Sequence, residues 1–382
     1  MMVKILATAD WQLDMRAHKL NKRAKDMLYD ARLRALDCLL KLGREHEVNA
    51  ILAAGDLFEV ANPRKSLISD VARILHDNNT VDVHIIPGNH DLCGHGSVWS
   101  QPELTSISHL HIYDKYDEID LGDFVLHPLP VHHKHELEPY DGLLRDVNGD
   151  DRIHVVMAHA HDVSYMDFST SSHEVEAKLP IDTSNVKQKG YDLCILGHWH
   201  SWTEVQDNAL YPGTHEQTKF GERDAGYVAL VEIEKGQLPS FTKLKTGQLI
   251  WKKEQFGVEG YTEDMLIARV DAIREDGCDF LHLTLTGEAD LMFLTDTIPR
   301  FDVAAQPRFG FLEIDVSGIQ QTIDIAAMQE KSSLPPMLNS VQEDILSEIA
   351  STTDESKLTH LQAELVEFWR CLRDSGLMEE VN

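Results

Sequence analysis

The sequence has few cysteines, and their placement excludes two common frameworks. Five cysteines occur in 382 residues, and no two of them form a Cys-x-x-Cys motif. The odd number and wide spacing argue against a disulfide scaffold and against a cysteine-based structural zinc site. We therefore expect thiols in a reducing compartment, at these positions: Cys38, Cys93, Cys194, Cys278 and Cys371.

Long hydrophobic runs are also absent. The N-terminal segment MMVKILATAD is too short for the apolar region of a signal peptide and runs directly into Asp10. No window has the roughly 18 consecutive apolar residues that a membrane-spanning helix needs. The sequence therefore predicts a soluble, cytoplasmic protein without a membrane partner.

Positive charge is scarce, with 35 Lys and Arg against 64 Asp and Glu and a net charge of -29. Nucleic-acid-binding proteins usually carry a basic surface, so this balance counts against a simple nucleic-acid binder. Bound metal cations reverse the local sign of a site, however, and DNA is not excluded. Hydrophobic content of 42% and charged content of 26% are ordinary for a soluble globular protein.

The first part of the chain alternates apolar runs with helical patterns, which predicts an α/β fold. Buried strands are expected at residues 3–8, 49–54, 81–87, 153–158 and 192–196, and helices at 24–46 and 64–77. Shorter strands are expected within residues 111–129 and 203–233. Residues 1–236 are therefore predicted to form one domain, with two packed mixed sheets flanked by helices in four layers.

Two smaller regions follow. Residues 241–330 are expected to form a small α+β domain, with an extended segment at 240–256, a helix at 262–275 and strands at 280–286, 291–294 and 309–316. The segment Ser332–Pro336 has the composition of a linker. Residues 337–382 are expected to be mainly helical, with apolar side chains at helical spacing.

Metal-ligand residue types follow five of the predicted buried strands. They are Asp10, Asp56, Asn89, His159 and His198. In open α/β sheets, ligand sites gather beyond the carboxyl ends of the strands. A hydrolase with two metal ions needs a shared carboxylate with imidazole and amide ligands around it, and mixed ligands of this kind suit manganese, iron or zinc. The pattern therefore predicts a centre for two divalent cations.

These motifs resemble those of the calcineurin-like metallophosphoesterase superfamily. The resemblance rests on Asp10-x-Gln12, Gly55-Asp56, Gly88-Asn89-His90-Asp91, His159 and Gly197-His198-Trp199-His200, and it covers residues 3 to about 232. It implies that Asp10, Gln12, Asp56 and His200 bind one metal ion, and that Asp56, Asn89, His159 and His198 bind the other. It further implies that His90 contacts the phosphate as a positioned acid, with Asp91 orienting it.

Three positions leave alternatives open. The superfamily usually has histidine where this chain has Gln12, and an amide oxygen is the weaker ligand. The affinity or the metal preference of the first site is therefore open, and Asp14 and His18 are the alternative ligands. His161 is the alternative to His159, which lies nearer the strand end. Trp199 is expected either to stack on a base or sugar or to pack in the wall of the site.

A narrower resemblance points to the SbcD-type DNA-repair exonucleases. It rests on the segment Tyr211–Glu222 followed by Gly226-Tyr227-Val228, and more weakly on the small domain and the C-terminal helices. It implies a Mn²⁺-dependent nuclease that acts on duplex ends, single strands and hairpins. It also implies a homodimer, a capping domain that admits DNA, and C-terminal helices that dock on an SbcC-type coiled-coil ATPase.

Two other functions are consistent with the same motifs. A phosphodiesterase for small nucleotides or a phosphoprotein phosphatase would have the same metal centre, and the net charge of -29 favours it. A scaffold that binds DNA ends or the ATPase without cutting is supported only by Gln12.

Overall fold

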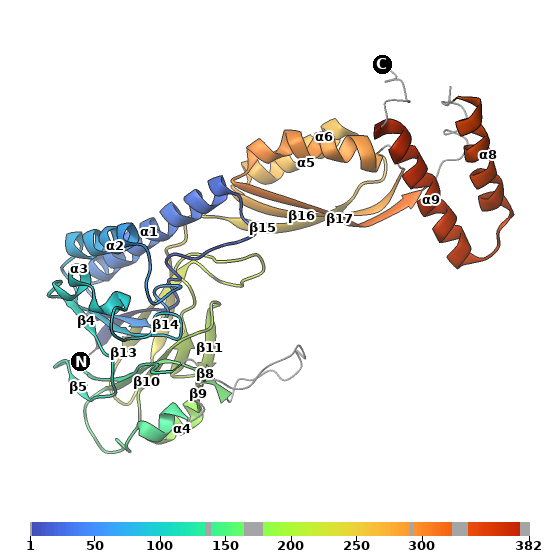
Figure 1. Ribbon diagram of the computed structural model, residues 1–382. Coiled ribbons are helices and arrows are strands. Elements are labelled where there is room, and N and C mark those ends of the chain that lie inside the picture. The colour runs from blue at the N-terminus through green and yellow to red at the C-terminus, as the bar shows by residue number, and fades with distance from the viewer. Residues whose placement is uncertain (1, 134–138, 164–178, 291–292, 323–334, 375–382) are drawn as a thin grey trace. The chain divides into compact units, whose positions relative to one another are not determined.

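In the computed structural model, the chain divides into two compact units, residues 1–251 and 252–382 (Figure 1). The structure describes residues 2–133, 139–163, 179–290, 293–322 and 335–374. In this part of the chain, no helix combines the length and the apolar composition needed to cross a bilayer.

The first unit is built on two six-stranded mixed sheets. The first sheet has the order β14-β13-β1-β2-β3-β4, and the second has the order β11-β12-β10-β7-β6-β5. The strands of the first sheet are β1 (Val3–Thr8), β2 (Ala50–Ala54), β3 (Val83–Ile86), β4 (Leu110–Ile112), β13 (Tyr227–Ile233) and β14 (Ser240–Lys245). Those of the second are β5 (Ile119–Asp120), β6 (Val125–Leu129), β7 (His154–His159), β10 (Leu193–Gly197), β11 (Thr203–Gln206) and β12 (Ala209–Tyr211).

Helices cover the outer face of each sheet. Helices α1 (Lys22–Glu45), α2 (Lys65–Asp77) and α3 (Pro102–Thr105) supply apolar residues to the core beside the first sheet, and α4 (Thr183–Gln188) supplies Val186 to the core beside the second. The predicted α/β class with two packed sheets between helices is thereby confirmed. Two short strands, β8 (His161–Asp162) and β9 (Pro180–Ile181), pair separately.

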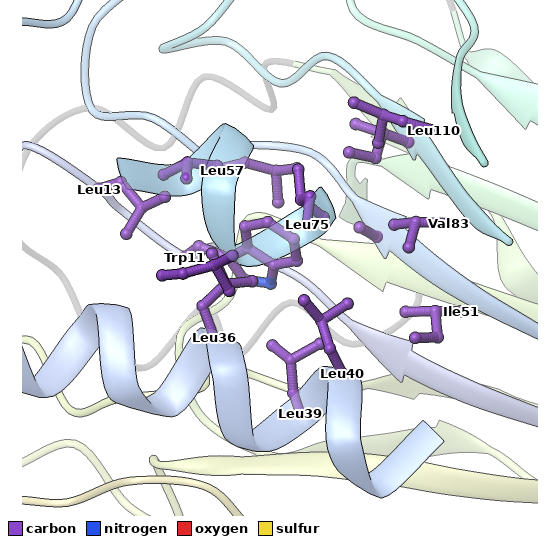
Figure 2. Close-up of a cluster of buried hydrophobic side chains, with 14 of the residues drawn as sticks. Trp11, Leu13, Leu36, Leu39, Leu40, Ile51, Leu57, Leu75, Val83 and Leu110 are labelled. Carbon is purple, nitrogen blue, oxygen red and sulfur yellow. The ribbon is translucent and has the colours of Figure 1, made fainter. Parts of the chain in front are cut away.

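Alternation along the strands explains the layers, because successive side chains of a strand point to opposite faces. In β2, Leu52 belongs to the core between the two sheets, whereas its neighbour Ile51 belongs to the core beneath the helices. Figure 2 shows the core beneath the helices, in which Leu36, Leu39 and Leu40 of α1 face the side of the sheet that carries Ile51. Each sheet therefore has one apolar face toward the other sheet and one toward the helices, and each helix turns its single apolar face to a sheet. The result is four layers.

The strands at the centre of each sheet are parallel. β1, β2, β3 and β4 run in one direction, as do β12, β10, β7 and β6. The carboxyl ends of parallel neighbours meet at one edge of their sheet. The loops that follow β1, β2, β3 and β10 and the last residue of β7 carry the predicted ligands.

The second unit contains a three-stranded sheet of order β15-β16-β17, in which β16 and β17 are parallel. Its elements are β15 (Trp251–Gly257), α5 (Glu263–Glu275), β16 (Phe280–Asp290), α6 (Ile298–Ala305) and β17 (Phe311–Thr322). Helices α8 (Pro336–Ser351) and α9 (Glu355–Asp374) share an apolar core of their own.

Two details differ from the sequence-based expectations. Strand β14 pairs with β13, so this segment, expected at the start of the second domain, belongs to the first unit. A strand was expected at residues 291–294. Residues 291–292 lie outside the described part, and Phe293–Thr297 is helical and leads into α6. Pro299 at the start of α6 favours this outcome, because a proline suits the first turn of a helix and lacks a strand donor.

Candidate metal centre

The loop that follows β1 is held against the loop that follows β2. The backbone N–H of Asp10 donates to the carbonyl of Gly55 at 3.0 Å, and that of Gln12 donates to the carbonyl of Asp56 at 3.1 Å. The side-chain amide of Gln12 donates to Oδ2 of Asp56 at 3.4 Å. Asp10, Gln12 and Asp56 are all buried, so three oxygen-bearing side chains meet inside the protein.

The backbone at these positions has unusual dihedral angles. Asp10, Gln12 and Asp56 have φ values of 50°, 48° and 53°, and His198 has a φ of 100°. A residue other than glycine rarely adopts a positive φ, and each such residue costs about 1–3 kcal/mol unless the surroundings enforce it. Four strained residues at one place are typical of a functional site.

Nearby glycines permit close packing around Asp56 and His159. A Cβ atom at Gly88 would lie 2.2 Å from Oδ1 of Asp56, and one at Gly197 would lie 1.8 Å from the carbonyl oxygen of Ala54. These positions therefore admit no side chain. The motifs Gly88-Asn89-His90-Asp91 and Gly197-His198-Trp199-His200 begin with glycine because neighbouring backbone and side-chain atoms leave no room for a Cβ there.

The Gly88–Asp91 loop is fastened to the end of β2 by Asp91. Its buried carboxylate accepts hydrogen bonds from the backbone N–H groups of Gly88, Leu57 and Phe58 at 2.7, 2.9 and 3.2 Å. Burial and the neighbouring Asp56 raise the pKa of Asp91 to about 7. Asp91 therefore holds the loop backbone that presents Asn89 and His90.

His90 lies beside this loop with its ring partly exposed. Its Nε2 is 3.9 Å from Oδ2 of Asp56, and its Nδ1 is 3.1 Å from the carbonyl oxygen of Glu59. Its side chain is 41% exposed, in contrast to 4% for Asp56. A ring that is held by one nitrogen and open to solvent is well placed to meet a substrate.

His159 joins the two sheets at the centre of the cluster. Its Nδ1 is 2.9 Å from the carbonyl oxygen of Ala54, and its Nε2 is 3.0 Å from Oδ1 of Asn89 and 3.4 Å from Oδ2 of Asp56. The bond to a carbonyl requires the proton on Nδ1 and so leaves Nε2 as the ligand atom. One ligand atom from each of Asp10, Asp56 and His159 falls within 4.8 Å of the others.

His198 and His200 lie beside this cluster. The backbone N–H of His198 donates to both carboxylate oxygens of Asp10 at 3.1 and 3.0 Å, and its ring lies 5.3 Å from that of His159. The Nδ1 of His200 lies 3.2 Å from Oε1 of Glu222 and 3.3 Å from Oγ1 of Thr218. A carboxylate behind an imidazole orients the other ring nitrogen toward a metal ion.

The structure brings eight of the nine predicted residues together through the contacts described above. The ninth, His200, lies near enough to interact electrostatically with Asp10 and His198. The alternative, His161, has its ring 6.3 Å from that of His198 and takes no part in the group formed by Asp10, Asp56 and His159. Sequence reasoning missed Glu59, and it cited Thr218 and Glu222 only as parts of the family segment Tyr211–Glu222. No strand-end signal marks these three residues.

The charges of the cluster fit divalent cations. Burial raises the pKa of Asp10 to about 6, against the attraction of His200 and His159. Burial acts on Asp56 too, but the attraction and hydrogen bond of His159 outweigh it and hold the pKa of Asp56 at about 2. The same contact with Asp56 outweighs the effect of burial on His159 and raises its pKa to about 9. Buried carboxylates in contact with imidazoles need a positive partner, and a cation would take the place of the imidazole proton.

Comparison with known proteins agrees with this geometry. The sequence profile of the family described as "Calcineurin-like phosphoesterase" matches residues 3–202, more than half of the chain. The protein belongs to the calcineurin-like phosphoesterase family. Its members use divalent metal ions to hydrolyse phosphoesters, so this chain is a metal-dependent hydrolase with a candidate metal-binding site at Asp10, Asp56 and His159.

Solved structures that are similar to this chain include two crystal structures. The crystal structure of TT1561 of Thermus thermophilus has 13% sequence identity and a TM-score of 0.39, and the match covers 64% of this chain and 100% of that chain. The crystal structure of a dimetal phosphatase from Danio rerio has 12% identity and a TM-score of 0.36, with 63% and 98% covered.

Proposed function

We propose that this protein is the nuclease subunit of an SbcCD-like complex that processes DNA ends, and that it hydrolyses DNA phosphodiesters with two divalent cations, Mn²⁺ first among them. The observation that carries the proposal is a cavity in the first unit whose wall carries more basic than acidic residues. A substrate with many phosphates needs such a surface.

This cavity has a volume of about 1130 Å³, and its wall includes Leu13 and Asp14, which follow Gln12 directly in the chain. Its basic residues are Arg16, Lys22, Lys25, Arg32 and Arg64, and its acidic residues are Asp14, Asp26 and Asp70. The balance is opposite to that of the whole chain, which has 64 acidic and 35 basic residues.

Not all five basic residues are available to a ligand. Arg32 is buried and donates to the carbonyl of Trp11, and Arg64 forms an ion pair with Asp14 at 2.8 Å. In the described part of the chain, Arg16, Lys22 and Lys25 form no ion pair. These three are the candidates for contact with the DNA backbone.

At the metal centre, the proposal assigns Asp10, Gln12 and His200 to one cation and Asn89, His159 and His198 to the other, with Asp56 between them. When bound, the two cations would clamp a phosphate and supply hydroxide at neutral pH. The partly exposed ring of His90 is placed to donate a proton to the leaving oxygen. Asp91 keeps the His90 loop in place through its three backbone contacts.

Further support comes from the segment Tyr211–Glu222 and from Trp199. Glu222 contacts the ring of His200, which gives this segment a part in the site. Trp199 is 46% exposed, and its ring lies 6.4 Å from that of His161. An exposed indole next to a metal ligand is suited to stack on a base or a sugar.

The proposal assigns the remaining parts by resemblance to SbcD-type proteins. The second unit would admit and shape DNA, the first unit would form a homodimer, and α8 and α9 would dock on the ATPase subunit. Met337 and Val341 of α8 are 80% and 41% exposed, and residues 338–382 carry ten acidic and three basic residues. An apolar and acidic helical surface suits a partner with a basic rim.

A second candidate function is supported by the net charge of -29, which disfavours a long polyanion and suits a small phosphodiester or a phosphoprotein. The non-catalytic scaffold is supported by Gln12 alone. Both candidates are tested by the same measurement.

The test is cleavage of end-labelled duplex, single-stranded and hairpin DNA in Mn²⁺, with bis(p-nitrophenyl) phosphate as the small substrate. It compares the wild type with His90→Ala and with His95→Ala, an exposed histidine five residues away. We expect DNA cleavage by the wild type and His95→Ala, and a rate lower by about 10²–10⁴ in His90→Ala. Hydrolysis of the small substrate without DNA cleavage would favour the second candidate, and inactivity on all substrates would favour the scaffold.

A further inference from the structure

A second group of metal-ligand residues lies at the beginning of β3, away from the strand ends described above. It consists of Asp82, His84 and His111, and one ligand atom of each falls within 4.8 Å of the others. Asn89 of the metal centre follows the other end of β3. At about 3.3 Å per residue of extended chain, the two groups are well separated along the strand.

The sheet register explains why these residues meet. β3 and β4 are parallel, and His84 lies directly opposite His111. Asp82 precedes His84 by two residues and therefore points to the same face. Tyr113 follows His111 by two residues and shares that face as well. Regular strand geometry alone produces this cluster.

The contacts within the cluster leave donor atoms for a cation. The rings of His84 and His111 are stacked, with centroids 4.8 Å apart and an interplanar angle of 18°. Nε2 of His111 lies 3.6 Å from Oδ1 of Asp82. Nδ1 of His84 lies 2.8 Å from the hydroxyl oxygen of Tyr113, so Nε2 of His84 is the nitrogen that remains for a ligand.

The cluster is also accessible from solvent. His84 is buried, but the side chains of Asp82 and His111 are 58% and 39% exposed, and β4 is the edge strand of the sheet. Among the described residues, Asp82 forms no ion pair with a lysine or arginine. A carboxylate that faces two imidazoles at an open edge therefore has a free side for a positive ion.

We propose that Asp82, His84 and His111 form a third cation site, which binds Zn²⁺ or a similar divalent ion and fastens the edge strand β4 to β3. Two imidazoles and one carboxylate are a usual zinc ligand set, with a fourth position for water. Zn–N and Zn–O distances are about 2.0–2.2 Å, so these three side chains would turn toward one another to bind one ion. Tyr113 orients His84 from behind, as partners of metal-bound histidines do. The site is independent of the proposed nuclease function.

The test is a zinc titration of the chelator-stripped full chain, followed by calorimetry and by elemental analysis of the bound metal. It is made in the wild type and in an Asp56→Asn background, which weakens the other centre. We expect one zinc equivalent in the Asp56→Asn protein to bind at least tenfold more weakly after Asp82→Asn or His111→Gln. We expect His76→Gln, which changes an exposed histidine on α2, to leave that equivalent in place.

Asp82→Asn changes an exposed side chain to one of the same shape, so this variant is expected to fold even where His111→Gln disturbs the stacked rings. Zinc should also raise the melting temperature of the Asp56→Asn protein, and Asp82→Asn should remove that rise. The proposal would be overturned if the Asp56→Asn protein and its three further variants bound zinc with equal stoichiometry and affinity and showed an equal zinc-induced rise in melting temperature. These readouts do not depend on DNA cleavage, so the two proposals can fail separately.

Discussion

The two sheets of the first unit contribute different chemistry to the metal centre. Loops after the strands of the first sheet supply the oxygen donors, namely Asp10, Gln12, Asp56 and Asn89. The second sheet supplies the imidazoles: His159 is the last residue of β7, and His198 and His200 lie in the loop after β10. Neither sheet has a complete set, so the centre exists only while the two sheets are packed together.

The point of closest approach illustrates this dependence. Gly197, at the end of β10 in the second sheet, lies so near β2 of the first that an added Cβ would be 1.8 Å from the carbonyl oxygen of Ala54. His159 binds the same carbonyl oxygen at 2.9 Å. The backbone of the first sheet therefore positions a ligand from the second.

The first prediction removes the shared oxygen donor. Asp56→Asn retains the shape of the side chain but loses the charge that faces both sheets. We expect hydrolysis of any phosphoester to fall by about a thousandfold, because two-metal stabilisation contributes several kcal/mol and each 1.36 kcal/mol is tenfold in rate. Initial rates in Mn²⁺ would measure the loss, with Asp77→Asn on α2 as the exposed control. A decrease of less than tenfold would contradict the central place of Asp56.

The second prediction separates the core between the sheets from the core beneath the helices. Leu52 and Ile51 are adjacent in β2 and almost fully buried, but they face opposite sides. Leu52→Ala and Ile51→Ala should each lower the free energy of unfolding by about 2–5 kcal/mol. We expect only Leu52→Ala to weaken Mn²⁺ binding as well, since it alone removes contact between the sheets. Urea unfolding and metal titration of the folded proteins would measure both effects. Equal Mn²⁺ affinity in the two variants would contradict the claim that packing between the sheets supports the metal centre.

The third prediction concerns the carboxylate behind a second-sheet ligand. Glu222→Gln should weaken metal binding by about 10–100-fold, because it removes the charge that orients and polarises His200. Mn²⁺ titration of activity would measure the shift, with Glu103→Gln as an exposed control. An unchanged Mn²⁺ midpoint would mean that Glu222 serves only to hold its own loop through Thr218.

The fourth prediction changes a first-sheet oxygen donor to nitrogen. Gln12→His places the imidazole that the superfamily usually has at this position. We expect tighter binding of the first cation by about tenfold, since imidazole is a stronger ligand than an amide for manganese, iron or zinc. Calorimetric titration with Mn²⁺ would test this, and weaker binding would show that the strained backbone at residue 12 suits glutamine alone.

Much of this site was predictable because the ligands follow buried strands. The strand at 3–8 was expected with the bounds that the structure has. The strands expected at 49–54, 81–87, 153–158 and 192–196 differ from β2, β3, β7 and β10 by one or two residues at their ends. Parallel strands then place Asp10, Asp56 and Asn89 at a common edge without any knowledge of side-chain positions. The motif pattern thus carried most of the information about the site.

Other features depend on tertiary contacts and left no local signal. Glu59 and Thr218 meet His90 and His200 only through the course of their loops. The pairing of β14 with the first sheet could not be read from its sequence either. Its alternation of exposed and half-buried residues is equally compatible with either unit. The Asp82 cluster was missed because strand position alone does not reveal which strands are neighbours.

The smallest expected effect lies in the second sheet, away from the metal centre. His127 in β6 and His154 in β7 are both buried, with His127 Nε2 2.9 Å from His154 Nδ1. Burial and then the neighbouring His154 lower the pKa of His127 to about 4. Other titratable groups that face it are Glu118, Arg145 and Arg152.

The unfolded chain therefore takes up this proton near pH 6.5, whereas the folded protein resists it until about pH 4. The contribution of His127 to the free energy of unfolding is complete above pH 6.5. It decreases by about 1 kcal/mol per pH unit as the pH falls from 6.5 to about 4. His127→Gln should reduce the slope of unfolding free energy against pH by that amount, measured in urea with a chelator present. His76→Gln, at an exposed position, should leave the slope unchanged. A slope that stays the same in His127→Gln would contradict this assignment and would show that other buried histidines, such as His84 and His154, carry the acid sensitivity.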